Sequence, residues 1–128
     1  MPLLHTSIRT SDMDRTVAFY TEVLGMELAR QKEIAERNLR ISFLEDGGGS
    51  QIEVLRVDGQ SAFQVPSYEK RVFDHLAYEV SDLDVVLASC RERGGEVVED
   101  PFRLPGSTSL YAFIQDPDGV TIELIQRA

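Results

Sequence analysis

The sequence predicts an α+β protein built from two tandem βαβββ modules. The first observation behind this prediction is an internal repeat with an offset of 70 residues, which aligns His5 with His75 and Glu53 with Glu123 without a gap. The second is the periodicity of apolar residues, which changes in both copies from strand-like to helix-like and back to strand-like. Such a module has one helix on one face of a small sheet and leaves the other face free for function.

The chain of 128 residues has the ordinary size of one domain with a real core. We expect a single domain over residues 1–128, with modules at about 3–57 and 73–127. Residues 58–72 would form the linker between the two modules.

Each module is expected to begin with a strand, at residues 3–9 and 73–80, and to continue into a helix. A Ser-Asp pair precedes each helix, and its carboxylate can accept hydrogen bonds from the free N–H groups of the first turn. Glycines after each apolar stripe supply the helix stop. The buried stripes predicted from helical spacing are Met13, Val17, Tyr20 and Leu24 in the first module, and Leu83, Leu87 and Cys90 in the second.

Three strands are expected after each helix, because runs of apolar and β-branched residues alternate there with turn-forming residues. The segments EDGGGS and QDPDGV have the composition of hairpin turns. The predicted strands cover residues 26–33, 39–45 and 51–57, and then 96–100, 109–115 and 121–126.

Charge and composition exclude several classes of function. The net charge of −9 argues against a broad surface for nucleic acid or anionic lipid. No apolar run reaches the roughly 18–20 residues of a membrane helix, and the N-terminus does not resemble a signal peptide, so a cytoplasmic protein is expected. The single cysteine, Cys90, excludes an internal disulfide and a cysteine-based zinc cluster, and its place on the helix stripe indicates buried packing.

Two histidines and two glutamates lie at repeat-equivalent positions on predicted strands. Strand alternation places His5, Ser7 and Arg9 on one face. Imidazole nitrogen and carboxylate oxygen together suit a divalent metal such as Zn, Ni, Co, Fe or Mn. The alternative is a pair of hydrogen-bonded structural histidines with solvent-facing glutamates, but these are the only two histidines of the chain.

Three segments carry a resemblance to a known family: LLHTSIRTSDMDRTVAFYTEVLGMEL, DHLAYEVSDLD and AFIQDPDGVTIELIQ. They resemble the vicinal oxygen chelate superfamily, and most of all its bacterial glyoxalase I (lactoylglutathione lyase) members. The resemblance implies two modules forming a cupped mixed β-sheet around a metal. It also implies a homodimer with sites shared between subunits, and the metal ligands His5, Glu53, His75 and Glu123.

The reaction implied by this resemblance converts the hemithioacetal of methylglyoxal and glutathione to S-lactoylglutathione, through a metal-stabilised enediolate. One divalent ion per site is implied, with Ni or Co favoured and Zn or Mn possible. Glu123 would be the base that moves the proton, with Glu53 as its pseudo-symmetric partner. Arg9 matches an arginine that holds a glutathione carboxylate.

Two positions depart from the glyoxalase pattern. Val57 stands where an Asn is common, and Pro105 stands where a Lys is common. Arg103 is the candidate to replace the missing lysine charge. These departures bear on glutathione recognition and leave the metal prediction unchanged.

Other functions stay open at this point. Methylmalonyl-CoA epimerases resemble this chain and have Gln or Glu at the position of Glu53, so a thioester is an alternative substrate. The closing DPDG segment favours a glyoxalase. A metal-free binding module similar to bleomycin-resistance proteins is the non-enzymatic alternative.

Overall fold

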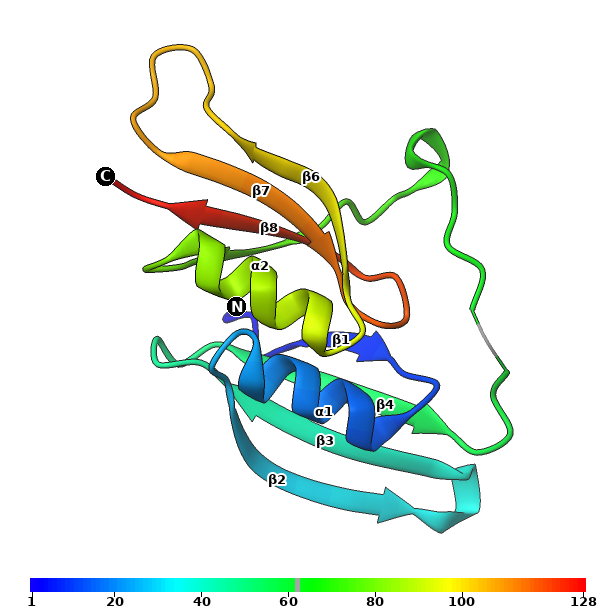
Figure 1. The fold of residues 1–128 in the computed structure, drawn as a ribbon. Coiled ribbons are helices and arrows are strands. Elements are labelled where there is room, and N and C mark those ends of the chain that lie inside the picture. Colours follow the sequence, from blue (N-terminus) through cyan, green and yellow to red (C-terminus); the bar gives the residue numbers. More distant parts are fainter. Residues whose placement is uncertain (62) are drawn as a thin grey trace. The chain divides into compact units, whose positions relative to one another are not determined.

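The computed structural model describes residues 1–61 and 63–128, and the chain divides into two compact units, Met1–Ala62 and Phe63–Ala128. Each unit contains one α-helix and one four-stranded mixed sheet (Figure 1). The α+β class and the βαβββ order, used twice, are therefore confirmed.

Unit 1 has the strand order β1-β4-β3-β2 in its sheet. The pair β1–β4 is parallel, whereas β4–β3 and β3–β2 are antiparallel. A short 3₁₀ helix, η1, which the sequence did not predict, joins β2 to β3. The elements are β1 (Thr6–Arg9), α1 (Met13–Glu22), β2 (Glu27–Ile34), η1 (Ala35–Arg37), β3 (Leu39–Glu45) and β4 (Gln51–Val57).

Unit 2 repeats this arrangement with the strand order β5-β8-β7-β6. The pair β5–β8 is parallel and the other two pairs are antiparallel. Its elements are η2 (Tyr68–Lys70), β5 (Leu76–Glu79), α2 (Leu83–Glu92), β6 (Glu96–Phe102), β7 (Leu110–Gln115) and β8 (Thr121–Gln126).

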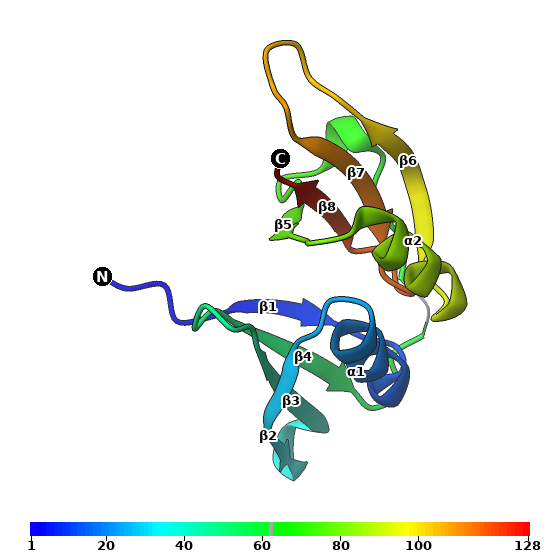
Figure 2. The ribbon, with the colours of Figure 1, turned by 60° about the vertical axis from the view of Figure 1, so that its left-hand side comes forward.

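One helix packs on one face of each sheet: α1 on β2, β3 and β4, and α2 on β6, β7 and β8 (Figure 2). The opposite face of each sheet is left without a helix of its own unit. Within the described residues, 1–61 and 63–128, no helix is long and apolar enough to cross a membrane.

The buried face of α2 is the predicted one, with Leu83, Leu87 and Cys90 all buried. The prediction for α1 was partly wrong. Tyr20 is fully buried, but Met13, Val17 and Leu24 are only half-buried. The residues that fill the core from this helix and its C-terminal end are Thr16, Phe19 and Val23.

Thr16 is buried although it is polar, because its hydroxyl forms a 2.6 Å hydrogen bond with the Thr10 hydroxyl. A buried hydroxyl with a partner avoids the desolvation penalty of an unpaired one. Thr16 can therefore face the core, although a pattern of apolar residues alone does not predict this.

Aspartates at repeat-equivalent positions hold the helix caps and hairpin turns of both units. Asp12 and Asp82 cap α1 and α2 by accepting from backbone N–H groups three residues later, at 3.0 and 3.2 Å. Asp46 and Asp116 each accept from two backbone N–H groups in the hairpins β3–β4 and β7–β8. These local bonds explain why two copies with different side chains keep the same backbone.

The first strand of each unit is shorter than predicted. β1 begins at Thr6, not at residue 3, because its parallel register with β4 starts at the pair Thr6–Ile52. Leu3 and Leu4 precede the strand and are exposed. In unit 2, β5 likewise begins only after His75. Both histidines therefore lie at the point where the chain enters the sheet.

Candidate metal centre

In unit 1, strand pairing brings His5 and Glu53 together. Glu53 lies in β4 between Ser7 of β1 and Phe43 of β3. The distance from His5 Nε2 to Glu53 Oε2 is 3.7 Å, and the His5 ring lies edge-on to Phe43 with centroids 5.7 Å apart. The Ser7 hydroxyl donates a 3.0 Å hydrogen bond to Glu53 Oε1.

Unit 2 places His75 and Glu123 in the same way. Glu123 lies in β8 between Ala77 of β5 and Phe113 of β7. His75 Nε2 is 3.9 Å from Glu123 Oε2, and its ring lies edge-on to Phe113 at 5.4 Å. The other ring nitrogen, Nδ1, is 2.6 Å from Asp74 Oδ1.

Both carboxylates are largely withdrawn from solvent, with 16% of the Glu53 side chain and 20% of the Glu123 side chain exposed. The histidines are more open, at 35% for His5 and 29% for His75. A half-buried carboxylate facing an imidazole nitrogen is stabilised by a cation placed between the two groups.

Each unit brings together one histidine and one glutamate. Among the described residues, no group of three or more His, Cys, Asp or Glu side chains surrounds a common point. The structure thus contains two matched pairs of potential ligands, one per unit.

A cavity of about 490 Å³ lies beside His75 in unit 2. Arg71 lines it and is fixed by two hydrogen bonds, from Nη1 to Thr121 Oγ1 at 2.8 Å and from Nε to the Pro66 carbonyl at 3.2 Å. This volume falls within the usual range for small-molecule sites. The rest of the described lining is formed by Tyr68, Asp74, Val98, Glu99, Phe113 and Gln115.

The hydrogen bond with His75 lowers the pKa of Asp74 below its ordinary value. Asp74 therefore stays ionised next to the ring over the physiological range. An ionised carboxylate accepts hydrogen bonds only, so a hydrogen bond at this contact requires a ring with its proton on Nδ1.

The two predicted arginines lie at the C-terminal end of β1 and directly after β6. Arg9 is at the end of β1, with Nη1 3.5 Å from Gln60 Oε1, and it is exposed. Arg103 follows β6 and donates to the carbonyl of Thr108 within the β6–β7 loop. Arg103 does not line the described part of the cavity beside His75.

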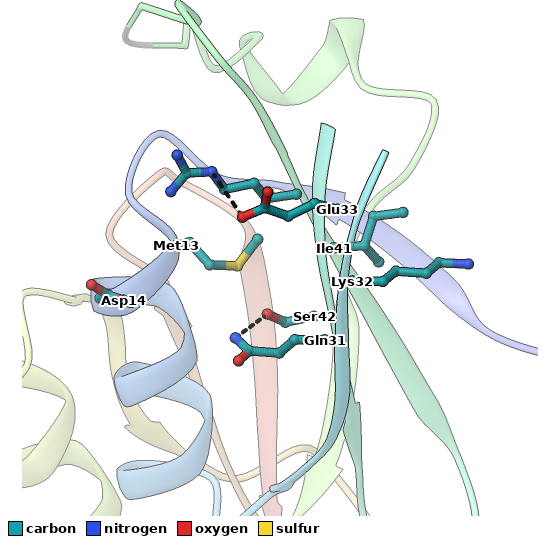
Figure 3. Close-up of a pocket in the computed structure, with 8 residues that line it drawn as sticks. Met13, Asp14, Gln31, Lys32, Glu33, Ile41 and Ser42 are labelled. Carbon is teal, nitrogen blue, oxygen red and sulfur yellow. Dashed lines mark hydrogen bonds and ion pairs between the residues drawn. The ribbon is translucent and has the colours of Figure 1, made fainter. Parts of the chain in front are cut away.

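A second cavity, of about 280 Å³, lies in unit 1 at the N-terminal end of α1 (Figure 3). Gln31 and Ser42, which line it, are bonded to each other at 2.9 Å. Neither candidate ligand of unit 1, His5 or Glu53, belongs to its described lining. It is therefore separate from the His5–Glu53 pair of unit 1.

Each unit of this small α+β protein repeats the βαβββ order and carries one histidine and one glutamate at matching places. The chain belongs to the Glyoxalase/Bleomycin resistance protein/Dioxygenase superfamily, whose family model matches residues 3–124. Membership of this family suggests a divalent metal cofactor.

Two curated relatives illustrate the similarity. The chain is 38% identical over 125 residues to a probable lactoylglutathione lyase of Vibrio cholerae, covering 97% of this chain and 89% of that protein. It is 39% identical over 125 residues to the lactoylglutathione lyase GLX1 of Arabidopsis thaliana, again over 97% of this chain. The chain spans only 44% of the length of the Arabidopsis protein.

Among solved structures, glyoxalase I from Zea mays matches with a TM-score of 0.84 and 31% identity, covering 98% of this chain and 44% of that one. The glyoxalase I of Leishmania major matches with a TM-score of 0.80 and 30% identity, over 98% and 86% of the two chains. The predicted resemblance to glyoxalase I is confirmed, and the relatives named lactoylglutathione lyase are carbon–sulfur lyases.

Asp74 and Ser7 each bond directly to a candidate ligand and were not predicted as site residues, although strand alternation placed Ser7 on the face of His5. Arg71 and Tyr68 line the cavity, whereas the sequence alone left open whether these linker residues border a cavity or are solvated. The repeat contained a usable signal for the first two, because Asp74 aligns with Leu4 and Ser7 aligns with Ala77. A polar residue in only one copy, next to a candidate ligand present in both, indicates a role specific to that copy.

Proposed function

We propose that this protein is a metal-dependent lyase of the glyoxalase I type. It would convert the hemithioacetal of methylglyoxal and glutathione to S-lactoylglutathione. The observation that carries the proposal is the pair of matched half-sites, His5 with Glu53 and His75 with Glu123, in a chain whose relatives are named lactoylglutathione lyases.

The donor set fits a divalent metal. With metal–ligand bonds of about 2.0–2.2 Å, neighbouring nitrogen and oxygen ligands lie about 3–3.5 Å apart. The nitrogen–oxygen distances of 3.7 and 3.9 Å are within a few tenths of an ångström of that range. Two imidazoles and two carboxylates are borderline to hard donors and suit several divalent metals. The resemblance to bacterial glyoxalases makes Ni or Co the first choice, with Zn or Mn as alternatives.

A complete site needs both kinds of half-site. Catalytic metal sites commonly use at least three protein ligands, and each unit offers two. We therefore propose that a half-site of the unit 1 type and one of the unit 2 type converge on each metal. A homodimer in which two subunits share their sites is the assembly we propose for this.

The side chains of this chain have distinct roles in the proposed reaction. When bound, the metal supplies Lewis-acid stabilisation of the negative charge that develops on the substrate oxygens. Glu123 removes the proton from one substrate carbon and returns it to the neighbouring carbon. Glu53 is the repeat-equivalent partner of Glu123, and His5 and His75 would hold the ion.

Recognition of an anionic cosubstrate rests mainly on Arg71. Its guanidinium is held in the cavity beside His75 by Thr121 and the Pro66 carbonyl, which fixes its direction before a ligand arrives. A guanidinium can bind a carboxylate with two parallel hydrogen bonds. We propose that Arg71 binds a glutathione carboxylate, and that Arg9, at the end of β1, binds another.

The test is an assay of S-lactoylglutathione formation from methylglyoxal and glutathione, with metal-free protein and with protein reloaded with Ni, Co, Mn or Zn. We expect turnover only with metal, and loss of turnover in Glu123→Gln. Glu79→Gln is the matched control, because Glu79 also lies on a sheet strand but pairs with Arg127 at 3.4 Å on the surface. If the protein binds metal stoichiometrically but shows no turnover with any of the four metals, glutathione is not its cosubstrate.

A further inference from the structure

The His75 ring has a carboxylate near each of its two nitrogens. Nδ1 is 2.6 Å from Asp74 Oδ1, and Nε2 is 3.9 Å from Glu123 Oε2. A neutral imidazole carries one N–H and one lone pair, so the partner of one nitrogen decides the state of the other. A proton on Nδ1 that is donated to Asp74 leaves the Nε2 lone pair directed to the side of Glu123.

The contact with Phe113 supports the same orientation. The ring of His75 stands nearly perpendicular to Phe113, at 83°, and the side chain is 29% exposed. Asp74 is itself half exposed, at 51%, so it remains accessible to water on its outer side. The contact with Phe113 thus orients the ring plane, and Asp74 is placed to accept a hydrogen bond from Nδ1.

The repeat provides a natural comparison, because unit 1 lacks this arrangement. Leu4 occupies the position equivalent to Asp74 and has no polar group to offer His5. In unit 1 the glutamate has the polar partner instead, because the Ser7 hydroxyl donates a hydrogen bond to Glu53. Unit 2 has Ala77 at the position of Ser7, which has no hydroxyl.

We propose that Asp74 is a positioning residue that holds His75 with its proton on Nδ1 and its Nε2 lone pair free to bind a divalent metal. This inference rests on the proposed metal site. Partners that hydrogen-bond to a metal-binding histidine commonly change metal affinity by about 10- to 100-fold when they are removed. Asp74 would therefore act on metal affinity, and on catalysis only through His75.

The first experiment uses metal-free protein. Because the chain has two histidines, ¹⁵N NMR of the imidazole rings at alkaline pH distinguishes their tautomers, with His5 as an internal reference. We expect the Nδ1–H form for His75 in the wild type and the Nε2–H form in Asp74→Leu, with His5 unchanged. Asp74→Leu copies the residue that unit 1 has at this position, and Asp74→Asn is a second variant that retains an oxygen acceptor.

The second experiment measures metal affinity by competition with a chromophoric chelator. We expect Ni or Co affinity to fall by about 10- to 100-fold in Asp74→Leu and by less in Asp74→Asn. The reciprocal variant Leu4→Asp should move His5 toward the Nδ1–H form. Thermal unfolding checks that each variant is folded.

The outcomes separate the two proposals. A wild-type His75 in the Nε2–H form, or unchanged affinity in Asp74→Leu, would overturn the role of Asp74 and leave the proposed lyase function standing. A wild-type protein without affinity for any of the metals would overturn the proposed metal site and, with it, the metal-positioning role of Asp74.

Discussion

The two units share a scaffold but differ in what surrounds the same trio of histidine, glutamate and phenylalanine. The helix caps and hairpin aspartates lie at equivalent positions and make equivalent backbone hydrogen bonds. The side chains around the phenylalanine of the trio have opposite character. Unit 1 has cations over Phe43, at 4.1 Å for Arg30 and 5.8 Å for Lys32.

In unit 2, an aromatic ring lies against the phenylalanine in place of one of those cations. Phe102 stacks against Phe113 with centroids 6.3 Å apart and against Tyr111 at 5.7 Å. Lys32 and Phe102 are repeat-equivalent residues, so one position has become cationic in one copy and aromatic in the other. The backbone of each copy is thus set by local caps and turns, whereas the side chains on the open face of the sheet differ between the two copies.

The face of unit 1 around Phe43 thus carries cations, whereas the equivalent face of unit 2 carries aromatic rings beside the Arg71 cavity.

The largest expected effect concerns the two glutamates. At saturating metal, Glu123→Gln should lower kcat by about 10²- to 10⁴-fold, because an amide cannot accept the substrate proton. Glu53→Gln should lower kcat less and act mainly on metal affinity. Steady-state kinetics with metal titration measures both, and equal losses of kcat would show that the two units contribute alike to proton transfer.

Arg71 should affect substrate binding more than chemistry. Arg71→Gln is expected to raise KM by about 10- to 100-fold with a smaller change in kcat, because a charge-assisted hydrogen bond contributes about 1.5–3 kcal/mol. Arg71 lies in the predicted linker, outside the repeated modules, so the repeat gives it no counterpart in unit 1. Lys70→Gln is the matched control, since Lys70 does not line the described cavity. A similar KM in both variants would exclude Arg71 as a binding residue.

The hairpin aspartates should differ in their effect on stability. Asp116 is 3% exposed and accepts from the backbone N–H groups of Asp118 and Val120. Asp116→Ala should therefore lower the free energy of unfolding by about 1–3 kcal/mol, since it leaves buried donors unsatisfied. Asp46→Ala, at the more solvated equivalent turn, should cost less. Urea denaturation measures both, and a larger loss at Asp46 would contradict the effect of burial.

The smallest expected effect is a pH dependence from Cys90. Burial raises the pKa of this thiol from 9.0 to about 11. Between these values the unfolded chain has lost the thiol proton and the folded protein still keeps it, so stability falls as pH rises from about 9 to 11. In Cys90→Ala this part of the pH dependence should disappear. Unfolding free energies of the two proteins at several alkaline pH values test it, and identical slopes would contradict the shift.

The sequence was sufficient for much of the fold. β3, β4 and β8 have the predicted bounds, because alternating residues and turn-forming neighbours define both of their ends. The start of β1 was wrong, since apolar residues at 3 and 4 look like strand residues even where no partner strand accompanies them. Thr16 faces the core because its hydroxyl bonds to that of Thr10. A pattern of apolar residues cannot predict such a bond between two polar side chains.

The repeat also identified the candidate ligands, because a histidine and a glutamate occur at the same place in both copies. It did not identify Asp74 or Ser7, whose contacts depend on side-chain rotamers. The orientation of Arg71 toward the cavity depends on its bond to Thr121, which lies 50 residues further along the chain. Contacts of this kind follow from the folded arrangement and cannot be read from local sequence.

The measurement that tests the account most directly is the metal content per chain of the wild type, His5→Ala and His75→Ala after reloading with Ni and removal of excess ion. If each metal needs a half-site of both kinds, the wild type retains one ion per chain and either substitution removes it. Full retention of metal in His5→Ala would show that the unit 1 pair is not part of the site, and would contradict the central claim.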